Sequence, residues 1–308
     1  MPVATLPAAS WAATPMTLDD LNAASRTRFV DALGPMFEDT EWVAERAWEV
    51  KPFPTVAALH QALFDEVLDA EESLQLEFLN GHPDLAGTAA QQRQMGQHST
   101  AEQAALGLDR LDSAGFERFA AMNEEYRARF GFPFLVCVRR HTRASIMRAF
   151  VRRLEADAAS ELQAALQEVF YITRLRVAGL VQGPGMPVVD GGLSTHVLDT
   201  ASGRPGAGVK VELFEITETG PELLVAAETN ADGRVPGGLI PDGQGPLRIG
   251  AYEIRFHVGD YFARIGMATA DPPFLDVVPV RVSLAEAESH YHVPLLVTPW
   301  TYVTYRGS

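Results

Sequence analysis

The chain has 308 residues, of which 47% are hydrophobic and 21% charged, and its formal net charge at pH 7 is -15. This length favours two domains over one, and the acidic balance argues against a nucleic acid or an anionic membrane as partner. The single cysteine excludes an intramolecular disulfide and a cysteine-rich metal site.

The sequence contains no sign of a membrane span or of an export signal. No apolar run approaches the roughly 18 residues of a transmembrane helix. Residues 1–15 lack a basic region followed by an apolar one, which a secretory signal requires. We therefore expect a cytoplasmic protein. Cys137 lies between apolar neighbours, so we expect a buried, inert thiol rather than a reactive one.

Residues 16–178 are predicted to form an all-α domain, a helical bundle, after an N-terminal tail at 1–15. Apolar residues recur with a helical period from Leu21 to Leu33 and stop at Gly34–Pro35. Thr55 is placed to cap a second such segment. The helical pattern continues over residues 99–106, 113–130, 144–154 and 160–177, and segments with a period of two are almost absent.

The pattern changes after a Gly- and Pro-rich stretch at 179–190, which is predicted to be a linker. Residues 191–308 contain alternating segments at 209–216, 252–258 and 277–282, separated by Gly, Pro and Asp clusters. Short alternating strands with regular turns are typical of a β-sandwich. The second domain is therefore predicted to be an all-β sandwich.

The first domain carries four polar segments, and each has an ordinary structural explanation. His82 lies in a turn before Pro83, and Ser99 with Glu102 fits a helix capping box. An aromatic segment, Phe130-Gly-Phe-Pro-Phe134, follows a helix end, and the arginines Arg174 and Arg176 are of a kind usually solvated on a helix. Taken singly, none of these segments indicates a function.

Their order, together with Phe37-Glu-x-Thr-x-Trp42, resembles the 2-oxo-4-hydroxy-4-carboxy-5-ureidoimidazoline (OHCU) decarboxylases. The resemblance implies that the catalytic residues are His82 and Glu102, and that the substrate-binding residues are Ser99, Gln103, Phe132, Phe134 and Arg176. Arg176 matches the family's substrate-binding arginine better than Arg174 does. Our hypothesis is that His82 is the acid or positions the leaving carboxylate. Glu102 would orient or charge His82 by raising its pKa, and Arg176 would anchor the substrate oxygens.

The second domain has polar residues in four further segments. His196 lies in Leu-Ser-Thr-His-Val-Leu-Asp-Thr, Arg234 follows a turn sequence, and His292 lies in Tyr-His-Val-Pro-Leu-Leu, before Tyr305-Arg-Gly-Ser308. A zinc site is an alternative, because two histidines at i and i+2 on a strand share one face. That set would be His196, His257, His290 and His292. No cysteine or paired carboxylate accompanies them, so we expect no metal.

These segments, in this order, resemble the transthyretin-like 5-hydroxyisourate hydrolases. The resemblance implies a metal-free hydrolase that assembles as a homotetramer through the sandwich. It also implies a site built from His196, Arg234, His292, Tyr305, Arg306, Gly307 and Ser308. A neutral histidine can take a proton from water at pH 7, and an arginine can hold developing negative charge on oxygen. The residues leave open whether His196 or His292 is the base.

The two resemblances together imply two consecutive reactions of urate breakdown, without a cofactor, on small-molecule ureide substrates. The second domain would hydrolyse 5-hydroxyisourate to OHCU, and the first would decarboxylate OHCU to (S)-allantoin. Two alternatives remain at this point. One domain alone is active, or the chain is a ligand-binding protein on a transthyretin-like sandwich.

Overall fold

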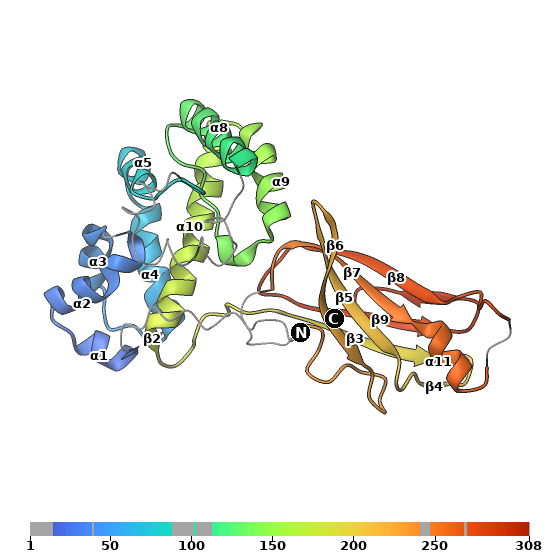
Figure 1. The fold of residues 1–308 in the computed structure, drawn as a ribbon. Coiled ribbons are helices and arrows are strands. Elements are labelled where there is room, and N and C mark those ends of the chain that lie inside the picture. The colour runs from blue at the N-terminus through green and yellow to red at the C-terminus, as the bar shows by residue number, and fades with distance from the viewer. Residues whose placement is uncertain are drawn as a thin grey trace. The chain divides into compact units, whose positions relative to one another are not determined.

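The computed structural model describes residues 15–38, 40–87, 102, 113–240, 247–267 and 270–307 (Figure 1). They form two compact units, which confirms the expected division into two domains. The helical unit comprises the described residues up to Arg139 and Ile146–Val189, and the strand-rich unit comprises Arg140–Ser145 and the described residues from Asp190. Within the described ranges, no helix has both the length and the apolar composition needed to cross a bilayer.

The helical unit is built from short helices around one long helix (Figure 1). In chain order these are α1 (Leu18–Ala23), α2 (Arg26–Leu33), η1 (Gly34–Phe37), α3 (Glu41–Trp48), α4 (Val56–Leu68), α5 (Glu72–Asn80), α8 (Ser113–Phe130), η3 (Val138–Arg140), α9 (Arg143–Leu154) and α10 (Ala158–Leu180). The last residue of η3 and the first three of α9 group with the strand-rich unit. A short parallel pair of strands, β1 (Met16–Thr17) and β2 (Val181–Gln182), is also present, so the prediction of an all-α domain was too strong.

Side-chain caps begin several of these helices. The Thr55 hydroxyl accepts a hydrogen bond from the Ala58 amide at 3.0 Å, which confirms the predicted cap of α4. The Asp157 carboxylate accepts from the Ser160 amide at 2.9 Å at the start of α10. The predicted helix at 99–106 lies outside the described residues, apart from Glu102, and so does the predicted capping contact of Ser99.

The predicted boundary at residues 178 and 179 falls inside α10, which runs on to Leu180 and passes directly into β2. The first part of the predicted linker is also hydrogen-bonded to the start of α4. The carbonyls of Pro184 and Gly185 accept hydrogen bonds from the amides of Val56 and Ala57, both at 3.0 Å. The glycine and proline content of this stretch therefore does not mean that the whole stretch is a free linker.

The strand-rich unit is a two-sheet sandwich (Figure 1). One sheet has the order β10-β9-β3-β4 and the other β6-β5-β7-β8, and a single buried cluster contains apolar residues of both. The strands are β3 (Gly192–Asp199), β4 (Arg204–Pro205), β5 (Lys210–Thr217), β6 (Gly220–Glu228), β7 (Gly250–His257), β8 (Val277–Leu284), β9 (His290–Val297) and β10 (Tyr302–Thr304). A helix that the alternation did not predict, α11 (Val258–Arg264), makes the expectation of an all-β domain too strong.

His60 makes the stability of the helical unit depend on pH. It is 2% exposed on α4, its Nε2 lies 2.9 Å from the Thr173 hydroxyl, and its ring packs against Phe170. Burial lowers the pKa of His60 from 6.5 to about 3. Between these values the unfolded chain binds a proton that the folded chain does not, so this stability is complete above pH 6.5 and is lost as the pH falls.

We expect the free energy of unfolding to decrease on acidification below pH 6.5, with up to about 1.4 kcal/mol per pH unit from this group. Urea unfolding followed by circular dichroism at several pH values measures the slope. His60→Gln should flatten the slope, and His257→Gln, in the other unit, should not. Equal slopes for wild type and His60→Gln would exclude His60 as the source.

Candidate active sites

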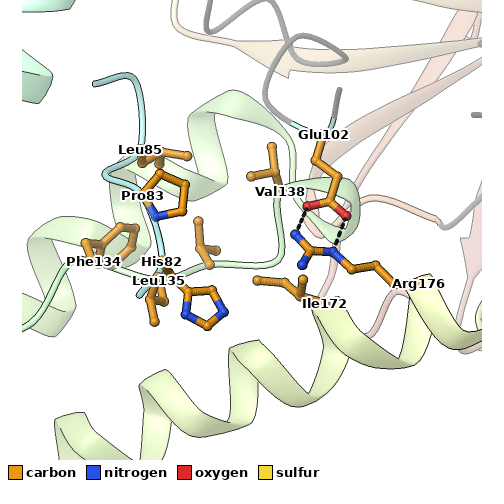
Figure 2. Close-up of a pocket in the computed structure, with 10 residues that line it drawn as sticks. His82, Pro83, Leu85, Glu102, Phe134, Leu135, Val138, Ile172 and Arg176 are labelled. Atoms are coloured by element: carbon orange, nitrogen blue, oxygen red, sulfur yellow. Dashed lines mark hydrogen bonds and ion pairs between the residues drawn. The ribbon is translucent and has the colours of Figure 1, made fainter. Parts of the chain in front are cut away.

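A pocket in the helical unit brings together residues from four separate parts of the chain (Figure 2). The segment after α5 contributes His82, Pro83 and Leu85, the segment between α8 and α9 contributes its wall, and α10 contributes Ile172 and Arg176. Glu102 completes the lining. The pocket therefore contains four of the predicted residues: His82, Glu102, Phe134 and Arg176.

His82 presents an unprotonated nitrogen in this pocket. The side chain is 4% exposed, and Nδ1 donates a hydrogen bond to the Phe78 carbonyl at 3.1 Å. A carbonyl can only accept, so in the neutral ring Nε2 carries the lone pair. Nε2 is buried and has no hydrogen-bond partner among the described residues. The ring is held edge-on to Phe78, with centroids 5.1 Å apart.

Burial is the largest effect on the pKa of His82, and it lowers that pKa. The carboxylates of Glu38 and Glu102 act in the opposite direction, but the net shift is downward. The two carboxylates thus raise the pKa of His82 as predicted, but burial outweighs them. The hypothesis that Glu102 charges His82 is therefore not met, and the ring is neutral at pH 7.

Arg176 lies between two carboxylates and is 1% exposed. Its Nε and Nη2 donate to the two oxygens of Glu102 at 3.1 and 3.0 Å, the bidentate pair drawn in Figure 2. Its Nη1 lies 2.8 Å from Glu38 Oε1 and donates to the Met36 carbonyl at 3.2 Å. Glu102 is thus hydrogen-bonded to Arg176, whereas the sequence hypothesis placed it against His82.

Glu38 is a site residue that the sequence analysis missed. It follows η1 in the left-handed region, with φ 52° and ψ 47°, a conformation that costs a non-glycine residue roughly 1–2 kcal/mol. Such strain tends to occur at functional sites. The quoted motif Phe37-Glu-x-Thr-x-Trp42 contained this residue, but nothing in the motif indicated that its carboxylate meets a buried arginine.

The aromatic segment after α8 divides between the pocket and the core behind it. Phe134 lines the pocket, whereas Phe132 packs against the ring of Tyr126 with centroids 5.9 Å apart. The wall is held by Arg153, which donates to the Leu135 carbonyl at 2.6 Å and lies 4.7 Å from the centre of the Phe134 ring. The other two predicted residues, Ser99 and Gln103, lie outside the described residues.

A second candidate site lies in the strand-rich unit, where three backbone pairings bring the predicted motifs together. β3 and β9 are parallel, with Ser194 opposite His292. Single bridges join His196 to Arg234 and His292 to Gly307. Residues that are about a hundred positions apart in the chain therefore become neighbours in space.

The turn before Arg234 is built by the residues that predicted it. The Asn230 side chain accepts hydrogen bonds from the amides of Asp232 and Arg234, both at 3.0 Å. Gly233 has φ 75°, and a Cβ there would lie 2.3 Å from the Val197 carbonyl oxygen. Only glycine fits this approach, and it places Arg234 beside His196 on β3.

The imidazoles of this site are in different environments. His196 is half-buried, and its Nε2 has no hydrogen-bond partner among the described residues. Burial lowers the pKa of His292, and the nearby Arg234, His196 and His290 lower it further. His292 is therefore neutral at pH 7, as a general base must be.

Residues 305–307 meet this site only through Gly307. The Gly307 amide donates to the His292 carbonyl at 2.7 Å. The Arg306 guanidinium lies 4.6 Å from the centre of the Tyr291 ring, and the Tyr305 side chain is 57% exposed. The backbone contact brings Gly307 into the site, whereas these contacts do not place Tyr305 or Arg306 against the histidines. Ser308 lies outside the described residues.

Both halves of the chain match known families. The family model described as OHCU decarboxylase matches residues 22–178, and the model described as HIUase/Transthyretin family matches residues 193–307. The chain is 41% identical to the 2-oxo-4-hydroxy-4-carboxy-5-ureidoimidazoline decarboxylase of Halalkalicoccus jeotgali over 167 residues, which are 54% of this chain and 93% of that protein. It is 53% identical to the 5-hydroxyisourate hydrolase of Deinococcus radiodurans over 117 residues, 38% of this chain and 96% of that protein.

One solved structure resembles nearly the whole chain. A crystal structure of (S)-allantoin synthase is similar over 96% of this chain and 100% of that one, with 32% sequence identity and a TM-score of 0.55. The match spans both units in a single protein.

Proposed function

The chain belongs to the OHCU decarboxylase family in its N-terminal half and to the HIUase/transthyretin family in its C-terminal half, and on this premise we propose that it converts 5-hydroxyisourate to (S)-allantoin in two steps. The strand-rich unit hydrolyses 5-hydroxyisourate to OHCU. The helical unit then decarboxylates OHCU with control of stereochemistry. The observation that carries this proposal is that each half has its own set of convergent polar side chains.

In the hydrolytic step, a neutral histidine takes a proton from water as the water oxygen attacks a carbonyl carbon of the ring. His292 suits this role because its pKa is lowered, and His196 remains the other candidate because its Nε2 is buried and unpaired. Arg234, which pairs with His196 through the backbone, supplies a fixed positive charge for the carbonyl oxygen.

In the decarboxylation step, no cofactor is needed if the ring of the substrate accepts the electrons of the breaking carbon–carbon bond. His82 starts neutral, so it must take a proton from water at Nε2 before it can deliver one. The carboxylate of the bound substrate would favour the charged ring. His82 then protonates one face of the ring carbon, which sets the configuration of the product.

Arg176 is proposed to bind oxygens of the substrate. In the structure, Nε and Nη2 of Arg176 both donate hydrogen bonds to Glu102. We infer that substrate oxygens take this edge and that the displaced Glu102 then faces His82, as the sequence hypothesis required. The Nη1 edge stays fixed by Glu38 and the Met36 carbonyl.

The fate of freshly generated 5-hydroxyisourate tests the function as a whole. Absorbance follows its loss, and circular dichroism follows the optically active product. We expect rapid appearance of (S)-allantoin. Racemic product formed at the spontaneous rate after fast loss of 5-hydroxyisourate would leave only the hydrolase, and unchanged decay of 5-hydroxyisourate would exclude the hydrolase.

Gly307→Ala should impair hydrolysis without unfolding the chain. A Cβ at residue 307 would lie 2.7 Å from His292 Cδ2, closer than carbon atoms approach, so the imidazole must move. A misplaced base lowers the rate sharply, by up to roughly 10²-fold for a shift of 1 Å. Hydrolysis is measured by absorbance, and decarboxylation by the same chain is the internal reference. A variant with normal hydrolysis would remove His292 from the mechanism.

We further propose that the protein is a cytoplasmic homotetramer that assembles through the sandwich, with catalytic domains at 16–178 and 191–308. Large side chains on and beside the edge strand β10 are exposed, as an interface strand requires: Trp300, Tyr302, Val303 and Tyr305. In the cytoplasm the thiol of Cys137, which is buried as predicted, stays reduced. Sedimentation velocity measures the assembly state, and a monomer at assay concentration would contradict this proposal.

A further inference from the structure

One hydroxyl in the strand-rich unit joins two histidines. Ser194 Oγ lies 2.9 Å from Nδ1 of His292 and 2.8 Å from Nε2 of His290. The β3–β9 register explains the arrangement, because Ser194 is opposite His292 and Gly192 is opposite His290. His290 and His292 are two residues apart on β9 and so share one face of the strand. From the sequence, His290 was a candidate only as a metal ligand, and Ser194 had no predicted role.

The three groups run from the interior to the surface. His292 and Ser194 are half-buried, whereas His290 is exposed. A hydroxyl can donate one hydrogen bond and accept another at the same time. Ser194 can therefore accept a proton from His292 Nδ1 while it passes its own hydrogen to His290 Nε2. A continuous hydrogen-bonded path thus leads from the candidate base to a side chain in contact with water.

The proposed hydrolysis needs such a path. The water oxygen bonds to the carbonyl carbon, the ring carbon–nitrogen bond breaks, and the freed nitrogen takes one of the two water protons. That nitrogen belongs to a ureido group and is not basic, so it takes no further proton. The carboxylic acid that forms ionises near pH 4, as carboxyl groups do. At pH 7 one proton per turnover must leave the site.

Resting on the proposed hydrolase function, we propose that Ser194 and His290 form a proton relay that carries this proton from His292 to solvent. His292 gives up its Nδ1 proton to Ser194 Oγ, Oγ gives its hydrogen to His290 Nε2, and His290 releases its Nδ1 proton to water. After the product leaves, water in the site takes the Nε2 proton of His292, and a solvent proton returns through His290 and Ser194 to Nδ1 of His292, which restores the starting tautomers. No oxidant, metal or further reactant is required.

The charges around the relay favour this direction. His292 is faced by His196 from β3, by Arg234 from the turn that pairs with β3, and by His290 on its own strand. These positive or potentially positive groups make a retained proton on His292 unfavourable. His290 lies at the exposed end of the strand, where water can accept the proton.

The test uses the full-length protein with His290→Gln and Ser194→Ala. Glutamine can still hydrogen-bond to Ser194 but cannot carry a proton. His257→Gln is the matched control, because His257 is bonded to Glu212 at 2.9 Å on the other sheet. The measurements are the pH dependence of 5-hydroxyisourate hydrolysis in weak buffer and its recovery with added imidazole.

We expect each relay variant to slow hydrolysis by about tenfold, less than the 10²–10⁴-fold loss of a direct acid or base. Imidazole should restore most of the rate to His290→Gln, since a small base can accept the proton at the surface. Its pH–rate profile should differ from that of wild type. His257→Gln should match wild type in both measurements.

Two results would overturn the relay. Wild-type rates in both variants would show that the proton leaves by another route. A loss that imidazole does not restore, with an unchanged pH profile, would show that the two residues only pack against His292. Failure of the proposed function is a separate result, in which the wild-type protein does not accelerate 5-hydroxyisourate hydrolysis or His292→Ala hydrolyses it normally.

Discussion

Replacing His82 by asparagine is expected to slow OHCU decarboxylation by roughly 10²–10⁴-fold, the range for loss of a direct acid or base. Asparagine can still donate a hydrogen bond to the Phe78 carbonyl, as His82 Nδ1 does at 3.1 Å. It has no counterpart to the unpaired Nε2 in the pocket. The substitution therefore removes the proton carrier and keeps much of the local structure.

OHCU made by a separate hydrolase provides the substrate, and circular dichroism of the product provides the readout. His60→Gln is the matched control, because His60 is equally buried but does not line the pocket. Hydrolysis of 5-hydroxyisourate by His82→Asn should equal that of wild type. Optically active allantoin formed at the wild-type rate would show that His82 is not the proton carrier.

Arg176→Met is expected to abolish decarboxylation and to destabilise the helical unit. The substitution leaves Glu38 and Glu102 without the guanidinium that both contact at 3.0 Å or less. Removing one member of a buried ion pair typically costs about 3–5 kcal/mol, because the remaining charge is uncompensated. Urea unfolding followed by circular dichroism measures this cost.

The matched control is Arg174→Met, two residues earlier on α10. The Arg174 guanidinium lies 5.0 Å from the centre of the Tyr171 ring, and the residue does not line the pocket. Adding Glu38→Gln to Arg176→Met should restore part of the stability, because it removes one of the two uncompensated carboxylates. It should not restore the activity. If Arg174→Met were the more damaging variant, the choice between the two arginines would be reversed.

Periodicity was sufficient to predict the two units and part of their elements. Helical spacing placed the segments that became α4 and α8, and alternation placed β5, β7 and β8. The smaller elements were missed because local pattern does not determine them. β1 and β2 are two residues each and form only because they meet, and α11 continues directly from β7 without a polar break.

The residue types of the sites were predictable, but their pairings were not. Glu102 was assigned to His82 because both belonged to one family pattern, yet its carboxylate contacts Arg176, which is 74 residues away. The protonation of His82 depends on how completely the pocket buries it, and burial is a property of the whole fold. Glu38 has a left-handed backbone conformation, which is uncommon for glutamate and could not be predicted from the sequence.

The parallel pairing of β3 with β9 bears on the order in which the two activities arise during synthesis. Its partners are about a hundred residues apart, with Ser194 opposite His292. Contacts that close such long loops form late, and domains made first generally fold first. Every described residue of the proposed decarboxylase pocket precedes β3 in the chain. During synthesis, the helical unit can thus fold before β9 of the strand-rich unit has been made. The proposed decarboxylase would then be complete before the proposed hydrolase, although it acts second.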